Sequence, residues 1–192
     1  MELLPDKDVL NFLHNTLVEL YSNTEDPITL GYSEGMVDVC VERPLTDIYN
    51  FIPFPHILHK AAVLMETMIG YHPFVDGNKR VALLATYYYP YWNGYDLHIP
   101  SGAAEFTVDV AKGNRNLNSI LSWLTRNTTR SWESVLRNKI LTIYVLLCHG
   151  NPKLEESIGL FIAPMVLVAY PFIYFRTVMA RKTKRMKRQK RI

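Results

Sequence analysis

A short polar run lies between two strongly apolar stretches of this 192-residue sequence. The run reads "HPFVDGNKR" and occupies residues 72–80. A polar loop between buried segments must either satisfy its polar groups internally or present them to a ligand. The run is therefore the first candidate for a functional site.

Two residues of the run could carry acid–base and metal chemistry. The imidazole of His72 titrates near neutral pH, so it can accept a proton from an attacking hydroxyl. The carboxylate of Asp76 is suited to hold Mg²⁺ against phosphate oxygens, because this ion prefers a carboxylate together with substrate phosphates. Pro73 and Phe74 lie between them, and we expect them to stiffen the loop and anchor it in the core.

The end of the run has the character of an anion site. Gly77 and Asn78 permit a tight turn at the predicted start of a helix, whose first backbone N–H groups lack intrahelical partners and attract anions. Lys79 and Arg80 add positive charge to the same first turn. A base, a metal-binding acid, an anion hole and neutralising cations together form the inventory of phosphoryl or nucleotidyl transfer.

An alternative interpretation treats the run as an ordinary connection between helices. In it, His72 is a hydrogen-bonded core residue, Asp76 caps the next helix, and Lys79 and Arg80 are solvated. Each residue taken alone favours this interpretation, whereas the order of the residue types favours the enzymatic one.

That order resembles the signature of the Fic and Doc family, which reads His, any, Phe, any, Asp or Glu, Gly, Asn, Gly or Lys, Arg. The resemblance extends over roughly residues 3–128 and is strongest over residues 57–90. Fic enzymes usually have Gly after the Asn and a second Arg three residues beyond the first. Here Lys79 and Leu83 stand at these positions, so the sequence is more similar to the Doc branch.

The resemblance implies a mainly α fold, a compact helical bundle with a small β-hairpin flap beside the motif that holds the target segment. It implies that His72 is the general base, that Asp76 binds Mg²⁺, and that ATP is the substrate. It also assigns nucleotide phosphate binding to four consecutive residues, namely Gly77, Asn78, Lys79 and Arg80. The implied reaction is Doc-like transfer of phosphate to a hydroxyl side chain of a target protein, such as a translation factor.

Two other functions stay open at this point. One is transfer of AMP, as in Fic-type adenylyltransferases, and the other is a non-catalytic Fic-fold module attached to a membrane or a partner. Many family members carry an inhibitory helix with Ser or Thr, three residues, then Glu and Gly or Asn. Thr129 and Glu133 offer this spacing, but Ser134 fails the last position. A separate antitoxin partner is therefore expected.

Apolar spacing predicts several helices that position the run. The predicted helices span residues 6–21, 34–41, 57–70, 78–89, 101–113 and 116–127. Asp6 or Asp8 is expected to cap the first helix, Gly70 to end the third and Ser101 to cap the fifth, while Pro90 should bend or end the fourth. Residues 44–55 mix β-branched and aromatic residues between prolines, which indicates an extended loop or a small hairpin.

The chain is predicted to divide into a catalytic domain, residues 1–130, and a helical extension, residues 131–192. Within the extension, residues 157–175 contain no charged side chain, and the basic tail 176–192 has nine Lys or Arg and no acid. The remainder of the chain carries 21 − 9 = 12 basic and 18 acidic residues, a net charge of −6. The tail therefore suggests contact with an anionic membrane or with RNA.

The cellular setting is expected to be cytoplasmic, with membrane attachment through residues 157–175 as one possibility and a buried helix as the other. A single span with the basic end inside would place the catalytic domain away from ATP, so the topology stays open. The start "MELLPDKDVLNFLH" lacks the features of a secretory signal. Cys40 and Cys148 show no metal-ligand spacing and are expected to be reduced, buried thiols.

Overall fold

The computed structural model describes residues 2–3, 5–136 and 138–139. Met1–Asn138 form one compact unit and Lys139–Ile192 a second. The first unit is mainly helical, which confirms the predicted fold class. Its elements in chain order are α1 (Lys7–Tyr21), α2 (Glu34–Glu42), the 3-10 turn η1 (Arg43–Leu45), α3 (Ile57–Tyr71), α4 (Asn78–Trp92), β1 (Asp96–Leu97), α5 (Ala103–Ala111), α6 (Leu117–Asn127) and β2 (Thr128–Thr129).

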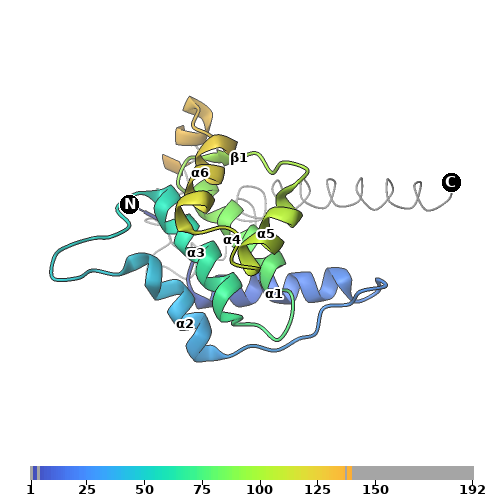
Figure 1. Cartoon of the computed structure of the whole chain (residues 1–192). Helices are drawn as coiled ribbons and strands as arrows, with labels where there is room; N and C mark the ends of the chain where they lie inside the picture. Colours follow the sequence, from blue (N-terminus) through green and yellow to red (C-terminus); the bar gives the residue numbers. More distant parts are fainter. Residues whose placement is uncertain (1, 4, 137, 140–192) are drawn as a thin grey trace, which may run out of the picture. The chain divides into compact units, whose positions relative to one another are not determined.

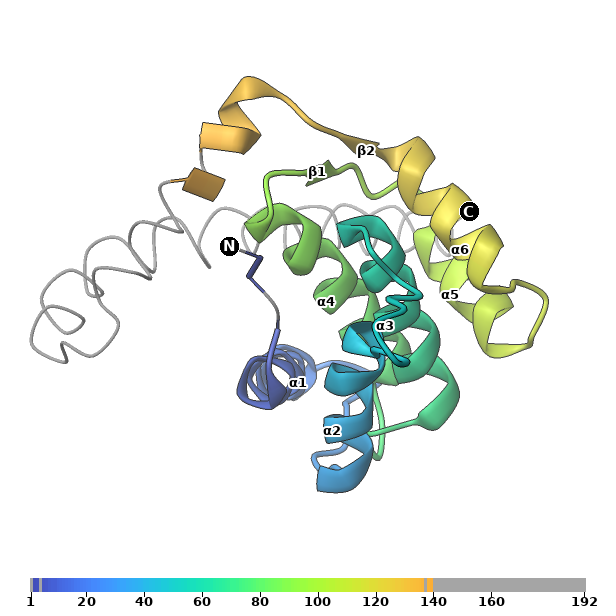
Figure 2. The ribbon, with the colours of Figure 1, turned by 90° about the vertical axis from the view of Figure 1, so that its left-hand side faces the viewer.

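Helices α3 and α4 form the centre of this unit. They pack against each other, with α1 and α2 on one side and α5 and α6 on the other (Figures 1 and 2). Both central helices are apolar around most of their circumference, which is the pattern of a helix buried on all sides. Residues of α3 and α4 that are at most 1% exposed include Ala61, Ala62, Val63, Leu64, Met65, Met68, Ile69, Val81, Ala82, Ala85 and Tyr89. The loop that joins these two helices is therefore fixed at both ends in the core.

Side-chain caps fix the starts of two helices. The Asp6 carboxylate accepts a hydrogen bond from the Val9 N–H at 2.9 Å, so Asp6 caps α1 as predicted. Asn116 caps α6 in the same way through the Ser119 N–H. The prediction of Ser101 as the cap of α5 is wrong, because Gly102 occupies the cap position and makes no side-chain hydrogen bond.

The ends of α3 and α4 differ from the prediction. Gly70 lies inside α3, and His72 takes the left-handed cap position with φ 49° and ψ 59°. Pro90 lies within the last turn of α4, which continues to Trp92. Pro90 has no N–H to donate to the Thr86 carbonyl four residues earlier, and the helix ends two residues after it. The Asn93 and Tyr95 N–H groups then close the end by donating to the Pro90 carbonyl.

Two kinds of short β structure accompany the helices. Strands β1 and β2 pair antiparallel, with Asp96 opposite Thr129 and Leu97 opposite Thr128. The predicted hairpin in residues 44–55 is also present, as Ile48 and Phe51 exchange both backbone hydrogen bonds at 2.9 Å. Tyr49 and Asn50 form its turn with φ 51° and 70°, the left-handed pair that the tightest hairpins require.

The C-terminal part is described only at its beginning. Residues 132–136 are helical, and the Asn138 side-chain amide donates to the Trp92 carbonyl at 2.6 Å, so this stretch packs on the end of α4. The domain boundary after residue 130 stays a prediction. Residues 157–175 and 176–192 lie outside the described residues. Within the part of the chain that the structure describes, no helix is both long and apolar enough to cross a bilayer.

Candidate active site

The motif loop, residues 72–77, lies between two left-handed backbone positions. His72 ends α3 with φ 49°, and Gly77 precedes α4 with φ 79°. A left-handed residue reverses the chain sharply, and two of them confine the loop between the ends of the two core helices. The His72 side chain is exposed at one end of this loop. The first turn of α4 lies at the other end.

The Asn78 side chain closes the loop from within. Its Oδ1 accepts from the Phe74 N–H at 2.9 Å, and its Nδ2 donates to the Phe74 carbonyl at 2.7 Å. Both residues are buried, with 7% and 2% of their surface exposed. An asparagine can satisfy both backbone polar groups of one residue in this way, because it carries a donor and an acceptor side by side. The part of Asn78 left for phosphate is therefore its backbone N–H.

The backbone amides at the start of α4 have the arrangement predicted for an anion site. The Arg80 and Val81 N–H groups both donate to the Gly77 carbonyl, which begins the helical ladder. Among the described residues, the Asn78 and Lys79 amides have no hydrogen-bond acceptor. The Gly77 N–H donates to Asp76 Oδ1 at 2.5 Å. Two adjacent amides, with the exposed Lys79 side chain on the same turn, thus remain available for phosphate oxygens.

Asp76 has the properties needed for a Mg²⁺ ligand. One carboxylate oxygen accepts from the Gly77 N–H, and no ion pair joins Asp76 to a cation within the described residues. The described residues also contain no group of three or more metal-ligating side chains. Mg²⁺ bound through one carboxylate takes its other ligands from substrate phosphates and water, so the donor set fits this ion when nucleotide is present.

Arg80 is already engaged in two contacts with the protein. Its Nη2 lies 2.6 Å from Asp26 Oδ2, and its guanidinium lies 4.6 Å from the centre of the Tyr21 ring. Tyr21 is the last residue of α1, so Arg80 lies on the side of α4 that faces α1. The Asp26 carboxylate is 79% exposed, so this ion pair is open to solvent and to competition from another anion.

His14 lies directly beneath the motif loop, and sequence reasoning missed it. The residue belongs to α1, is fully buried, and bonds through Nε2 to the Asp76 carbonyl at 3.0 Å. Its ring stacks on Phe74 with 4.2 Å between the centres. Burial lowers the pKa of His14, so the ring is neutral. The only sequence signal was a histidine among the leucines of an otherwise apolar helix face.

A second distant segment supports the loop from the other side. Residues 31–33 lie antiparallel to residues 73–75, with Tyr32 opposite Phe74. The Ser33 N–H donates to the Pro73 carbonyl at 2.8 Å and the Val75 N–H to the Gly31 carbonyl at 2.9 Å. The exposed Tyr32 and Val75 side chains flank the loop at this point. The loop is thus fixed by α1 on one side and by this strand segment on the other.

Comparison with known proteins agrees with the geometry of the loop. A family profile described as "Fic/DOC family" matches residues 4–89. The "Toxin Doc" of Mycolicibacterium smegmatis (strain ATCC 700084 / mc(2)155) is 33% identical over 106 residues, a match that covers 50% of this chain and 78% of the relative. The chain belongs to the Fic/DOC family. Members of this family are typically protein-modifying transferases, and the matched region contains the whole motif loop.

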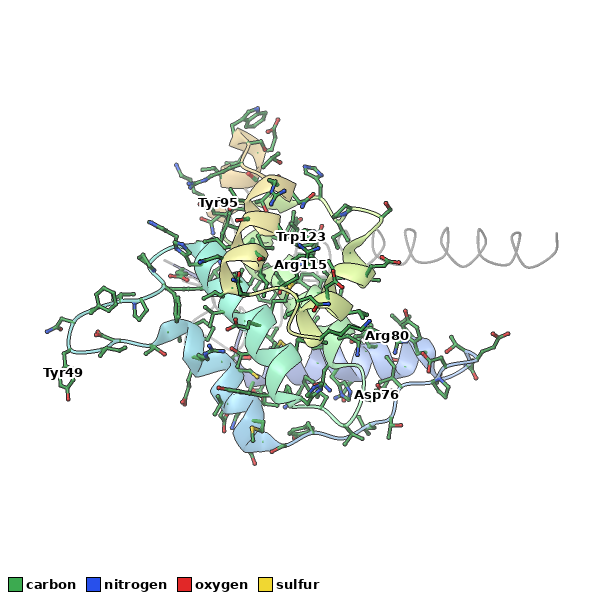
Figure 3. All side chains as sticks on the ribbon, in the orientation of Figure 1. Tyr49, Asp76, Arg80, Tyr95, Arg115 and Trp123 are labelled. Atoms are coloured by element: carbon green, nitrogen blue, oxygen red, sulfur yellow. The ribbon has the colours of Figure 1, made fainter. Side chains whose placement is uncertain are left out.

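The hairpin of this Fic/DOC chain lies at a distance from the motif loop. It precedes the first residue of α3, whereas His72 follows the last, and fifteen helical residues span about 22 Å. Figure 3 shows Tyr49 at its tip on the opposite side of the unit from Asp76. The hairpin was expected beside the motif. A role in holding a target segment stays a prediction.

Two weaker features of the sequence do not form sites in the described part of this Fic/DOC chain. Thr129 is in β2 whereas Glu133 is in the following helix, so they do not lie on one inhibitory helix. His56 and His59 are three residues apart in the sequence and could suggest a metal-binding pair. Their rings stack with 5.3 Å between their centres, but the described residues hold no group of three or more metal-ligating side chains.

Proposed function

We propose that this chain transfers the γ-phosphate of ATP to a hydroxyl side chain of a target protein, in the manner of Doc. The arrangement of the motif loop carries the proposal. An exposed imidazole at one end and two unpaired helix-start amides at the other are joined by a loop in which the Asn78 side chain satisfies both backbone groups of Phe74. The family and the Doc relative support the same reading.

In the proposed reaction, His72 takes the proton from the acceptor hydroxyl as its oxygen attacks the γ-phosphorus. A bond forms between that oxygen and phosphorus, the bond to the bridging oxygen of ADP breaks, and ADP leaves. The Asn78 and Lys79 amides and the Lys79 ammonium stabilise the charge on the phosphate oxygens. Asp76 would hold Mg²⁺, which neutralises phosphate charge when it is bound.

The direction of transfer depends on how the nucleotide lies. Leu83 occupies the position where Fic enzymes have a second Arg, and it is only 4% exposed within the core face of α4. No cation therefore reaches the far phosphates from this position. Lys79 adds bulk and charge at the anion site. These two observations favour phosphate transfer over AMP transfer.

Arg80 can assist only by exchanging its partner. We propose that it turns from Asp26 to a nucleotide phosphate, because both are anions that compete for one guanidinium. The cost is small, since an exposed ion pair contributes at most about 1 kcal/mol.

The partners follow from the same proposal. The relative is named a toxin. We extend this role to the chain, with a separate antitoxin as its inhibitor and a translation factor as the expected target. The basic tail, residues 176–192, would bring the chain to RNA or to an anionic membrane.

Transfer is tested with ATP labelled separately at the α and γ phosphates. The full chain is incubated with each nucleotide, Mg²⁺ and purified bacterial translation factors, and labelled protein is separated on a gel. Only the γ label should appear on protein, and removal of divalent cations with EDTA should prevent it. Protein labelled only from α-labelled ATP would replace the proposal with AMP transfer. Absence of both labels from the translation factors and from a clarified bacterial extract would contradict catalysis.

The role of His72 is tested by substitution. His72→Ala should abolish labelling without a change in the unfolding midpoint, because the side chain is exposed and makes no hydrogen bond within the described residues. His98→Ala is the matched control, since His98 is an exposed histidine on the β1–β2 side of the unit whose side chain, among the described residues, bonds to Thr129 Oγ1 alone. Equal labelling by wild type and His72→Ala would remove this imidazole from the reaction.

A further inference from the structure

We propose that His14 is a positioning residue, whose Nε2–H fixes the Asp76–Gly77 peptide so that the amides at the start of α4 face the phosphates. The inference rests on the proposed function for its consequence, but its structural part is independent of it. His14 is 62 residues away from Asp76 in the sequence. It is fully buried, so it can act on a ligand only through the loop above it.

The burial of His14 indicates that a histidine, rather than an apolar residue, is required at this position. The residue is 0% exposed and shares the core face of α1 with Leu10, Leu13 and Leu17. A leucine there would avoid the cost of burying two ring nitrogens, of which Nδ1 finds no partner within the described residues. The imidazole is therefore not explained by packing alone. Its one hydrogen bond is to the Asp76 carbonyl at 3.0 Å.

That hydrogen bond determines the tautomer and the direction of the peptide. A carbonyl can only accept, so Nε2 must carry a proton. The Asp76 C=O and the Gly77 N–H belong to one planar trans peptide and point in opposite directions. With the carbonyl directed down to His14, the Gly77 N–H is directed away from it, where it meets Asp76 Oδ1. A flipped peptide would instead present a carbonyl oxygen where the amides should face an anion.

Neighbouring contacts make His14 part of one support for the turn. The His14 ring stacks on Phe74, the residue that Asn78 holds through both of its backbone groups. His14 Cδ2 would lie 3.8 Å from a Cβ placed on Gly77. The same side chain thus contacts the loop at Phe74 and Asp76 and leaves no empty space beside Gly77. Loss of the donor should release the peptide while the rest of the loop stays packed.

Two substitutions separate the donor from the ring. His14→Gln keeps an N–H near the position of Nε2 and loses the aromatic ring, whereas His14→Phe keeps the ring and loses the donor. If the donor positions the peptide, His14→Phe should lower kcat by about a hundredfold, as expected for a misplaced charge-stabilising group, with little change in KM for the acceptor. His14→Gln should stay within about tenfold of wild type. Unfolding midpoints are measured for both, because a purely structural role predicts that activity follows stability.

The opposite ranking would overturn the inference. If His14→Phe matches wild type, or if the activity of both variants only follows their midpoints, His14 is a packing residue. A measurement on the unaltered protein covers the case in which a variant does not fold. The ¹⁵N resonances of the His14 ring should show a protonated Nε2, and a bare Nε2 would refute the inference.

The outcome is distinguishable from failure of the proposed function. If wild type labels no protein, the proposed reaction fails, yet the peptide orientation can still be read from the backbone amide resonance of Gly77. That resonance should move in His14→Phe and be retained in His14→Gln. If wild type labels protein while the Gly77 resonance is unchanged in His14→Phe, the positioning role alone is wrong.

Discussion

Replacing Asn78 by Ala tests the internal closure of the motif loop. The substitution leaves the Phe74 N–H and carbonyl without partners, and both lie in a region that is 2% exposed. Each buried polar group left unpaired costs about 1–3 kcal/mol, so with two such groups the free energy of unfolding should fall by about 2–6 kcal/mol. A domain stable by about 5–15 kcal/mol would usually remain folded after this loss. The rate of γ-phosphate transfer by Asn78→Ala should nevertheless fall steeply, because the loop no longer fixes the position of the α4 amides relative to His72.

Asn93→Ala is the matched control for this experiment. Asn93 lies just beyond the other end of α4 and bonds to the Leu3 N–H, the Leu3 carbonyl and the Tyr89 carbonyl at 2.7–2.9 Å. Urea denaturation should show a comparable loss of stability in both variants, whereas γ-phosphate transfer should be lost only in Asn78→Ala. A change of less than about 0.5 kcal/mol in Asn78→Ala, typical of a surface substitution, would refute the reasoning.

Three further predictions concern residues near the loop and the core. Gly77→Ala should destabilise by about 1–3 kcal/mol more than an ordinary surface change and reduce transfer, because φ is 79° and the new Cβ would lie 3.1 Å from Ile28 Cγ2. Gly113 has φ 76° and open space around it, so Gly113→Ala should lose only the stability that backbone strain costs, as measured by urea denaturation. Equal losses of stability in the two variants would show that crowding against Ile28 contributes nothing at Gly77. Asp26→Asn should release Arg80 and tighten binding of Mg–ATP by at most about fivefold in calorimetry, while Asp109→Asn, which breaks the exposed pair with Arg115, should leave it unchanged. Weaker binding in Asp26→Asn would show that Arg80 does not exchange its partner. Cys40 is buried and its pKa is raised to about 12 by that burial, so at pH 8 it stays protonated. In a Cys148→Ser background a thiol reagent at pH 8 should label Cys40 only after denaturant is added, and labelling of the native protein at the rate of a free thiol would contradict this.

Local interactions made much of the fold predictable. The helices appear where apolar spacing indicated them, and Asp6 caps α1 because its acceptor lies three residues from its donor. The candidate site residues from His72 to Arg80 form one loop and one helical turn, so a linear motif was enough to find them. The hairpin at residues 48–51 was likewise a local feature.

Contacts between distant residues were beyond this kind of reasoning. The bond of His14 to Asp76 joins residues 62 positions apart, and the pairing of Tyr32 with Phe74 joins residues 74 − 32 = 42 positions apart. Nothing in the spacing of the sequence announces either contact. Gly70 was expected to end α3 because glycine adopts left-handed φ most easily, but the helix packs beyond it and His72 takes that conformation instead. Tertiary packing outweighed local preference there.

The dependence of the motif loop on α1 and on residues 31–33 has a consequence during synthesis. Translation proceeds from the amino end, so both supports leave the ribosome before the histidine motif does. When residues 72–80 emerge, their partners are already outside the exit tunnel. The chain between the partners and the motif must then close into a loop, and the entropic cost of closure rises only slowly with the length of that loop. A fragment that began after residue 33 could still form α3 and α4 but would lack the surface that shapes the turn between them. Catalytic activity should therefore appear in one step, after residues 72–80 have emerged. It should not increase gradually with the length of the nascent chain.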